Sequence, residues 1–208
     1  MSEQTKPNIC DALDFVFLSP TNLAQPLNKK PERVLEDEVC KAYIKTFAGE
    51  PWNEYMKCPV CNEAYSEEEF KKLSGLEDAR CKRSNCESVE KNQRLKLVPH
   101  YTREEVRKEI LGEAVGCTGF QGLAAVLYGK DVTGAAWGYE LPRDKDIHTV
   151  KMTLVRPKIE EQGITLSKPF YAAAIFIPPE FQGKGIGTEL AYARFVLAQR
   201  AGHDQDFF

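Results

Sequence analysis

Three glycines alternate with two other residues in the stretch Gln182-Gly-Lys-Gly-Ile-Gly187, near the end of the chain. The nearly continuous apolar run Phe170–Ile177 comes before it and indicates a buried strand, and a helical pattern follows over Thr188–Arg200. Glycines at a strand-to-helix junction let several backbone N–H groups converge at the positive end of a helix dipole, where anions bind. The stretch therefore predicts a phosphate-binding loop, to which Lys184 adds a positive charge. A glycine-rich helix start that binds no ligand is the alternative.

The spacing of the glycines excludes two common phosphate loops. A Walker loop requires Gly-Lys followed by Ser or Thr, and a dinucleotide fingerprint requires Gly-x-Gly-x-x-Gly. The pattern found here, Gln-x-x-Gly-x-Gly between a strand and a long helix, resembles motif A of the GNAT family of N-acetyltransferases. The chain order of two helices, a hairpin, a buried strand and the loop also resembles that family. The segments Pro51-Trp-Asn-Glu54 and Ala136-Trp-Gly-Tyr-Glu140 look like a bacterial branch of it.

The resemblance implies that the loop binds the pyrophosphate of acetyl-CoA and that the preceding strand offers its backbone to the pantetheine arm. It also implies transfer of the acetyl group to a primary amine of a small-molecule or peptide acceptor that the sequence does not identify. A non-catalytic acyl-CoA-binding or zinc-module adaptor is the alternative. The residues expected to contact acetyl-CoA are Ile175, Phe176, Ile177, Gln182, Gly183, Lys184, Gly185, Ile186, Gly187 and Thr188.

Glu140 is the predicted catalytic base. The implied reaction needs a group that takes a proton from the ammonium, so that the neutral amine attacks the thioester. Glu140 ends a strand that is expected to border the acceptor pocket, and an exposed strand-end carboxylate is the alternative. Trp52, Trp137 and Tyr139 are candidates for the wall of the acceptor site or for the core. The tyrosine that commonly protonates the thiolate in the family has no assignable position in this sequence.

Four of the seven cysteines form two pairs, Cys58-Pro-Val-Cys61 and Cys81-Lys-Arg-Ser-Asn-Cys86. A short gap lets both thiolates of a pair face one ion, and Zn²⁺ accepts four sulfur ligands tetrahedrally. The pattern therefore predicts a structural zinc site at Cys58, Cys61, Cys81 and Cys86, with no open position for a catalytic water. Free surface thiols and a disulfide are the alternatives. The remaining three, Cys10, Cys40 and Cys117, are expected to be small buried apolar residues.

The four cysteines lie in a segment that is poor in aliphatic residues and rich in Lys and Glu, over residues 56–95. Its capping box Ser66-Glu-Glu-Glu69 predicts a short helix that buries Phe70 and Leu73 and ends at Gly75. A core with so few apolar residues needs an additional source of stability, which a bound metal would supply. The basic side chains of the segment form either a solvated face or a contact with nucleic acid or protein: Lys82, Arg83, Lys91, Arg94 and Lys96.

The rest of the chain alternates between helical and strand patterns. A helix is predicted over Pro31–Ala48 and another after the capping box at Thr102, with Val106, Ile110 and Ala114 on one face. An edge strand is expected over residues 12–18, a hairpin over 119–140 and a short helix with flanking loops within 142–169. On the last helix the apolar stripe is expected to consist of Ile186, Leu190, Ala193 and Leu197.

The predicted fold class is α+β: a GNAT-like mixed, mainly antiparallel sheet flanked by helices, with a small zinc-ribbon- or knuckle-like insertion. Residues 1–55 form the first part of the main domain, 56–95 the zinc-binding insertion, and 96–208 the remainder as far as the helix after the loop. In the family a further strand, a helix and two more strands would follow. We therefore expect the sequence to be a fragment. A second chain that completes the sheet, as in a homodimer, is the alternative.

Composition excludes some classes of partner. A net charge of −3 and a pI near 5.8 argue against a dedicated nucleic-acid-binding protein, because no strong positive field is present. The apolar run Leu13–Leu18 is interrupted by Asp14 and is too short to span a membrane or to act as a signal peptide. We therefore expect a cytoplasmic protein without a membrane partner, which agrees with cysteines arranged for metal binding.

Overall fold

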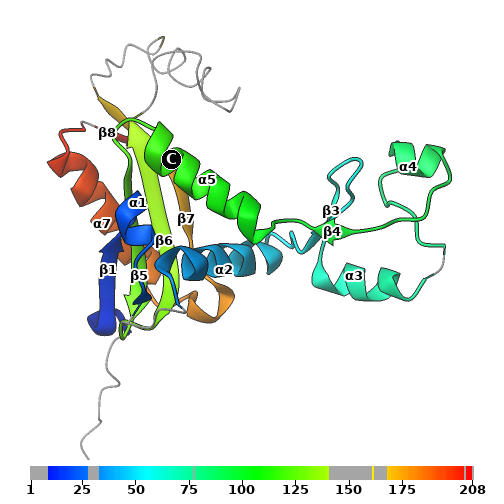
Figure 1. The fold of residues 1–208 in the computed structure, drawn as a ribbon, viewed down its shortest axis with the longest axis horizontal. Coiled ribbons are helices and arrows are strands. Elements are labelled where there is room, and N and C mark those ends of the chain that lie inside the picture. Colours follow the sequence, from blue (N-terminus) through cyan, green and yellow to red (C-terminus); the bar gives the residue numbers. More distant parts are fainter. Residues whose placement is uncertain are drawn as a thin grey trace, which may run out of the picture.

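A five-stranded sheet in the order β1-β5-β6-β7-β8 forms the centre of the molecule (Figure 1). The computed structural model describes residues 9–27, 33–76, 78–140, 161, 168–203 and 205–207, the last three as backbone only. Only β7 and β8 pair in parallel; the other neighbours are antiparallel, which confirms the predicted class. The strands are Leu13–Phe17 (β1), Gln121–Leu127 (β5), Asp131–Glu140 (β6), Pro169–Phe176 (β7) and Gln205–Phe207 (β8).

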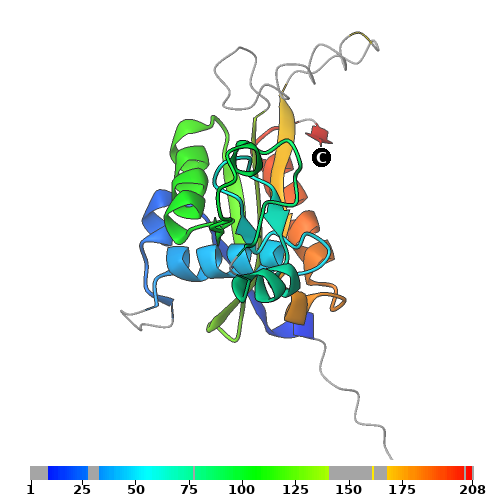
Figure 2. The same cartoon turned by 90° about the vertical axis from the view of Figure 1, so that its right-hand side faces the viewer.

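Helices cover both faces of this sheet, with α2 and α5 on one face and α7 on the other (Figure 2). None of the helices in the described ranges combines the length and the apolar character needed to cross a membrane. The elements are a 3₁₀ turn η1 (Ile9–Ala12) and the helices α1 (Pro20–Leu23), α2 (Leu35–Ala48), α5 (Arg103–Gly116) and α7 (Ile186–Arg200).

The two faces of the sheet are packed differently. Large side chains fill the face under α2 and α5, where Trp137 of β6 is buried among Val39, Val106 and Phe176. On the other face the sheet offers mainly small residues, and Leu190 of α7 packs closely against them. Fully burying one aliphatic side chain contributes about 1.5–3 kcal/mol, so both layers are fixed firmly on the sheet.

The N-terminal ends of α2 and α5 are held together by ion pairs. The Arg107 guanidinium lies 2.8 Å from the carboxylate of Glu36, and Arg103 pairs with Asp37. Glu36 is buried, so its pair with Arg107 is shielded from solvent on one side. These ion pairs hold the first turns of α5 against α2. They therefore also fix where the later turns of α5 lie over β6.

Most of the predicted elements are confirmed. The edge strand is β1, the hairpin is β5–β6, and both capping boxes form, at Ser66 and at Thr102. The helix expected from Pro31 begins at Leu35 instead, after Val34 has bridged to Pro26 in extended conformation; Pro31 lies outside the described residues. The short helix expected within 142–169 falls almost entirely outside them as well.

Two packing predictions are wrong. The buried residues of α7 are Ile186, Leu190, Arg194 and Ala198, so a guanidinium occupies a position in the buried stripe, while Ala193 and Leu197 are only half-buried. The strand β7 is not buried on both faces, since Ile175 is 40% exposed. Ile175 lies beyond Tyr171, the last residue of β7 that pairs with β8, and no other strand of the described part of the chain covers the outer edge there.

The cysteine-rich segment forms a separate small body beside the C-terminal end of α2 (Figure 1). Its three-stranded sheet has the order β3-β2-β4 and extends to Pro99, past the predicted boundary at residue 95. Phe70 and Leu73 are half-buried rather than buried. The elements are Met56–Lys57 (β2), Ala64–Tyr65 (β3), Glu67–Ser74 (α3), Glu87–Glu90 (α4) and Val98–Pro99 (β4).

We expect Gly138→Ala to lower the free energy of unfolding by about 3 kcal/mol, a typical cost of overpacking. A Cβ at this position would lie 2.2 Å from the carbonyl oxygen of Tyr171 and 2.5 Å from the ring of Phe170. Gly112→Ala on α5 is the matched control, because a Cβ there meets nothing within 4 Å. Urea unfolding of both variants measures the difference; equal midpoints would contradict the close approach of β6 and β7.

Candidate functional site

The glycine loop connects β7 to α7. After β7 the chain forms the 3₁₀ turn η4 (Pro179–Phe181) and then enters α7 at Ile186. Gly183 and Gly185 have φ angles of +70° and +82°, a left-handed conformation that side chains disfavour. Gly185 is the N-cap of α7 and has no side chain to satisfy the helix amides. The glycines are therefore required by the path of the backbone.

The backbone amides of residues 183–187 donate no hydrogen bond to any protein group in the described part of the chain. The first amides of α7 that bond to protein are those of Thr188 and Glu189, at 3.0 and 3.2 Å from the carbonyl oxygen of Gly185. Residues 183–185 are exposed, Ile186 is buried and Gly187 is half-buried, and space is open within 4 Å of a Cβ built on Gly183. Amides left open at a helix N-terminus form an anion site.

Side chains from three elements fix the conformation of the loop. Gln182 donates from Nε2 to the carbonyl oxygen of Ile177 at 2.9 Å, and Lys184 donates from Nζ to that of Glu180 at 2.6 Å. The Glu180 carboxylate pairs with Lys45 of α2, whose last turn also approaches Pro179 closely. The Gln182 and Lys184 side chains thus brace the loop from within, and α2 supports it from outside.

An open strand edge leads to this loop. The strand β7 pairs with β6 along most of its length but with β8 only through Tyr171. From Ala172 onward, its outer backbone edge has no strand neighbour among the described residues. Ile175 is exposed there, whereas Phe176 is buried against Tyr43 and Trp137. The residues expected to contact pantetheine and pyrophosphate thus follow one another along the chain, although the side chains of Phe176 and Ile186 are buried.

Glu140, the predicted base, lies half-buried at the end of β6 and pairs in register with Phe170. Its side chain points to the face opposite that of Tyr139, because successive strand residues alternate. On that face a Cβ at Gly119 would lie 3.4 Å from Cβ of Glu140 and 3.1 Å from the His203 ring. Glu140 is thus on the α7 side of the sheet.

The three aromatic candidates for the acceptor site lie in different environments. Trp137 and Tyr139 are buried under α2 and α5, and the ring centroid of Tyr139 lies 5.5 Å from that of Tyr171. Trp52 is 56% exposed and packs only one edge against Phe47, at 5.5 Å between ring centroids. Trp137 and Tyr139 are therefore close to the centre of the sheet, and Trp52 lies at the surface.

Two carboxylates that sequence reasoning missed face the buried aromatic residues from α5. Trp137 donates its indole N–H to Glu113, and burial raises the pKa of both Glu113 and Glu109. The sequence contains a trace of this arrangement, because Glu105, Glu109 and Glu113 recur at every fourth residue beside the buried stripe of α5. An apolar pattern alone does not show that Glu113 of this row turns toward β6.

The structure brings together the four predicted metal ligands. The Sγ atoms of Cys58, Cys61, Cys81 and Cys86 all lie within 4.8 Å of one another. Two of the separations are 3.8 Å (Cys58–Cys86) and 3.6 Å (Cys61–Cys81). Tetrahedral zinc with Zn–S bonds of about 2.3 Å places its sulfurs ~3.8 Å apart, so the set fits zinc. A disulfide requires about 2.05 Å between sulfurs and is excluded for these pairs.

Polar groups around the sulfurs suit thiolates. The Tyr65 hydroxyl donates to Cys81 Sγ at 3.3 Å, and Ser88 Oγ lies 3.0 Å from Cys86 Sγ. The contact with Ser88 lowers the pKa of Cys86 to about 6, whereas burial raises the pKa of Cys61 to about 12.

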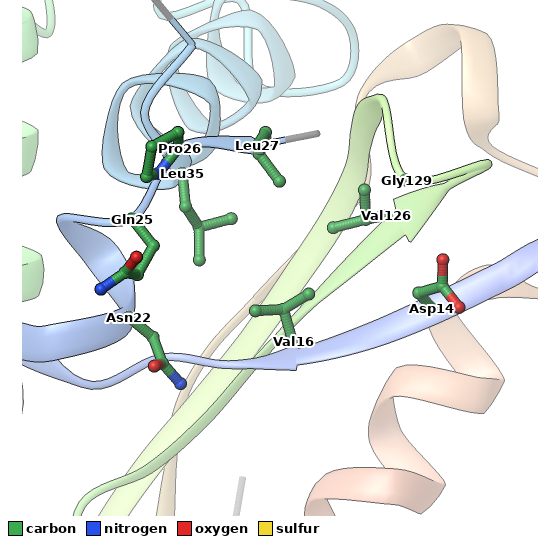
Figure 3. Close-up of a pocket in the computed structure, with 9 residues that line it drawn as sticks. All are labelled: Asp14, Val16, Asn22, Gln25, Pro26, Leu27, Leu35, Val126 and Gly129. Atoms are coloured by element: carbon green, nitrogen blue, oxygen red, sulfur yellow. The ribbon is translucent and has the colours of Figure 1, made fainter. Parts of the chain in front are cut away.

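A cavity of 320 Å³ lies apart from these sites, between β1, β5 and the start of α2 (Figure 3). Its walls are mostly apolar, including Val16, Leu35 and Val126, and Asp14 is the one ionisable residue among those that line it. No residue expected to bind acetyl-CoA or metal contributes to it. The loop and the edge of β7 remain the better candidates for a ligand site.

Several solved structures are similar to this chain, while no family model and no curated protein matches it. The aminoglycoside N-acetyltransferase AAC(6')-Iy, in complex with a bisubstrate analogue, is 11% identical with a TM-score of 0.43, over 94% of this chain and 77% of that one. An aminoglycoside acetyltransferase from an uncultured soil metagenomic sample, in complex with sisomicin, is 11% identical with a TM-score of 0.38, over 96% and 78%. A protein of Bacillus halodurans is 13% identical with a TM-score of 0.34, over 52% and 56%. Such low scores assign no activity to this chain.

Proposed function

We propose that this chain binds acetyl-CoA and transfers its acetyl group to a primary amine. The observation that carries the proposal is the run of open backbone amides at residues 183–187, directly after the part of β7 that has no outer strand neighbour among the described residues. The amides suit a pyrophosphate, and an open strand edge suits the amide groups of a pantetheine arm. The resemblance of the loop to motif A of the GNAT family supports the same ligand.

The proposed reaction is direct attack of the amine on the thioester carbon. Acetyl-CoA is held by the loop and by the backbone of Ile175–Ile177, so the thioester is placed along the open edge of β7. Holding both reactants in attack geometry supplies much of the rate acceleration. Glu140 is the base predicted from the sequence. Because it lies on the α7 face of the sheet, the effect of replacing it can be compared with the effect of replacing a carboxylate on the opposite face.

Calorimetric titration of the purified chain with acetyl-CoA tests the binding. We expect a dissociation constant in the micromolar range, about −8 kcal/mol. Pantetheine serves as the control ligand, because it has the arm but no pyrophosphate and is expected to bind at least ~100-fold more weakly. Equal affinities for the two ligands would show that the loop does not hold the pyrophosphate.

An acyl-CoA-binding adaptor without catalysis is the second candidate. The exposed module beside α2 favours it, since a small body outside the main sheet is free to contact a partner. Release of free CoA thiol from acetyl-CoA in the presence of a panel of small amines and lysine peptides separates the two candidates. An adaptor binds acetyl-CoA but releases no thiol above the rate of hydrolysis.

The cysteine cluster is proposed to hold one structural Zn²⁺ through Cys58, Cys61, Cys81 and Cys86. The support is the preformed set of four sulfurs at separations that suit tetrahedral zinc. Four protein ligands leave no position for water, so the ion would supply folding free energy rather than catalysis. Thiolate ligands persist in a reducing compartment, which supports the proposed cytoplasmic location.

A further inference from the structure

Glu113 is the carboxylate that the fold positions most firmly near the open end of β7. It lies on α5 and is half-buried against β6, where the indole N–H of Trp137 donates to its Oε2. One oxygen of the carboxylate accepts the indole N–H, and the other accepts no hydrogen bond from the described residues.

Register places Glu113 close to the expected thioester. Trp137, which donates to Glu113, pairs with Ala174 of β7, and Tyr139 pairs with Tyr171, so these two residues of β6 bracket the point where β7 and β8 diverge. Trp137 lies on β6, one strand inward from β7 at a spacing of about 4.8 Å, and its indole N–H contacts the Glu113 carboxylate on the α5 side of the sheet. Glu140 follows Tyr139 directly but faces the other side of the sheet.

No Lys, Arg or His of the described residues forms an ion pair with Glu113. The titratable groups that interact with it from α2, α5, β6 and β7 are all acidic or neutral: Tyr43, Glu109, Cys117, Tyr139 and Tyr171. Trp137 fixes its orientation without neutralising its charge. A half-buried carboxylate in such surroundings suits a cationic amine as its partner.

We infer that Glu113 is a catalytic residue of the proposed reaction: it binds the acceptor amine and takes its proton. The inference rests on the proposed function. The amine arrives as an ammonium ion and gives one proton to the Glu113 carboxylate. Its lone pair then attacks the thioester carbon, the C–N bond forms and the C–S bond breaks. The CoA thiolate takes up the second proton lost by nitrogen, and the proton on Glu113 passes to solvent.

The surroundings of Glu113 also determine how the rate depends on pH. Burial raises the pKa of its carboxyl group above the usual range. A base must be deprotonated to act, so the rate rises with pH through this raised pKa. The same shift means that ionised Glu113 costs the folded state stability at neutral pH, because the folded chain holds the proton more tightly than the unfolded chain.

The test uses Glu113→Gln and the amine from the panel that gives the fastest thiol release. We expect kcat to fall by about 10²–10⁴-fold, the ascending limb of the pH–rate profile to disappear, and acetyl-CoA affinity to stay unchanged. Thermal stability at neutral pH should not decrease, since Gln keeps the oxygen that accepts from Trp137. The matched control is Glu104→Gln, an exposed glutamate of the same helix that pairs with Lys108 at 3.0 Å.

Each outcome bears on a different claim. Full activity of Glu113→Gln, or loss of activity with an unchanged pH limb, would overturn the role of Glu113. A large loss in Glu140→Gln with none in Glu113→Gln would assign the proton transfer to the α7 face instead. Failure of the parent chain to bind acetyl-CoA would refute the proposed function itself, and titration detects this without any acceptor.

Discussion

Gly185→Glu is expected to abolish acetyl-CoA binding while the chain remains folded. The new carboxylate would lie at the N-cap of α7, among the open amides of residues 183–187. It would repel the pyrophosphate and occupy the amides that hold it. We expect the affinity to fall by at least ~100-fold, about 2.7 kcal/mol, in a calorimetric titration.

Gly202→Glu is the matched control for this variant. Gly202 has a φ of +81° against +82° for Gly185, and a Cβ there meets nothing within 4 Å. The same left-handed conformation costs both variants about 1–3 kcal/mol of stability. Gly202 follows the C-terminal end of α7, far from the loop, so its variant should keep full affinity. Unchanged binding by Gly185→Glu, or equal losses in both variants, would sink the assignment of the loop.

Cys58→Ser is expected to release the metal and unfold the module while the main sheet stays intact. Serine is a poor ligand for Zn²⁺, and the module has few buried residues apart from the cysteines themselves. Metal analysis should show about one zinc per parent chain and almost none in the variant. Amide hydrogen exchange should lose protection over residues 56–99 and keep it in β5 and β6.

Cys117→Ser provides the comparison, because Cys117 is a half-buried thiol at the end of α5, outside the cluster. It should retain both the zinc and the protected module. A parent chain without zinc would remove the premise of this prediction. A Cys58→Ser variant that retains one equivalent of zinc would show that Cys58 is not a ligand.

The parts of the site that depend on local sequence could be predicted, and the parts that depend on packing could not. Gly183 and Gly185 occupy left-handed positions that the chain needs at a tight strand-to-helix turn, so their types reveal the loop. The paired cysteines are likewise recognisable from spacing. Glu113 was missed because its role arises only when α5 packs on β6 and brings Trp137 to it.

The exposure of Ile175 and the burial of Arg194 could not be predicted from the sequence either. Ile175 sits in an apolar run typical of a strand covered on both faces, but it is 40% exposed and lies beyond the part of β7 that pairs with β8. Arg194 lies on the buried face of α7, a position that an apolar pattern assigns to a hydrophobic residue. In both cases a neighbour distant in sequence decides the environment, so residue type and periodicity carry too little information.

The module enters and leaves the main body through adjacent residues. The amide of His100 donates to the carbonyl oxygen of Tyr55 at 3.2 Å, and Met56 pairs with Pro99 in the first rung of the small sheet. Because the two connections lie side by side, a tight turn can replace the whole insertion without moving the end of α2 or the start of α5. We therefore expect that the insertion can be removed as a unit, and a chain shortened in this way would separate the effect of the proposed metal from binding of the proposed acetyl donor.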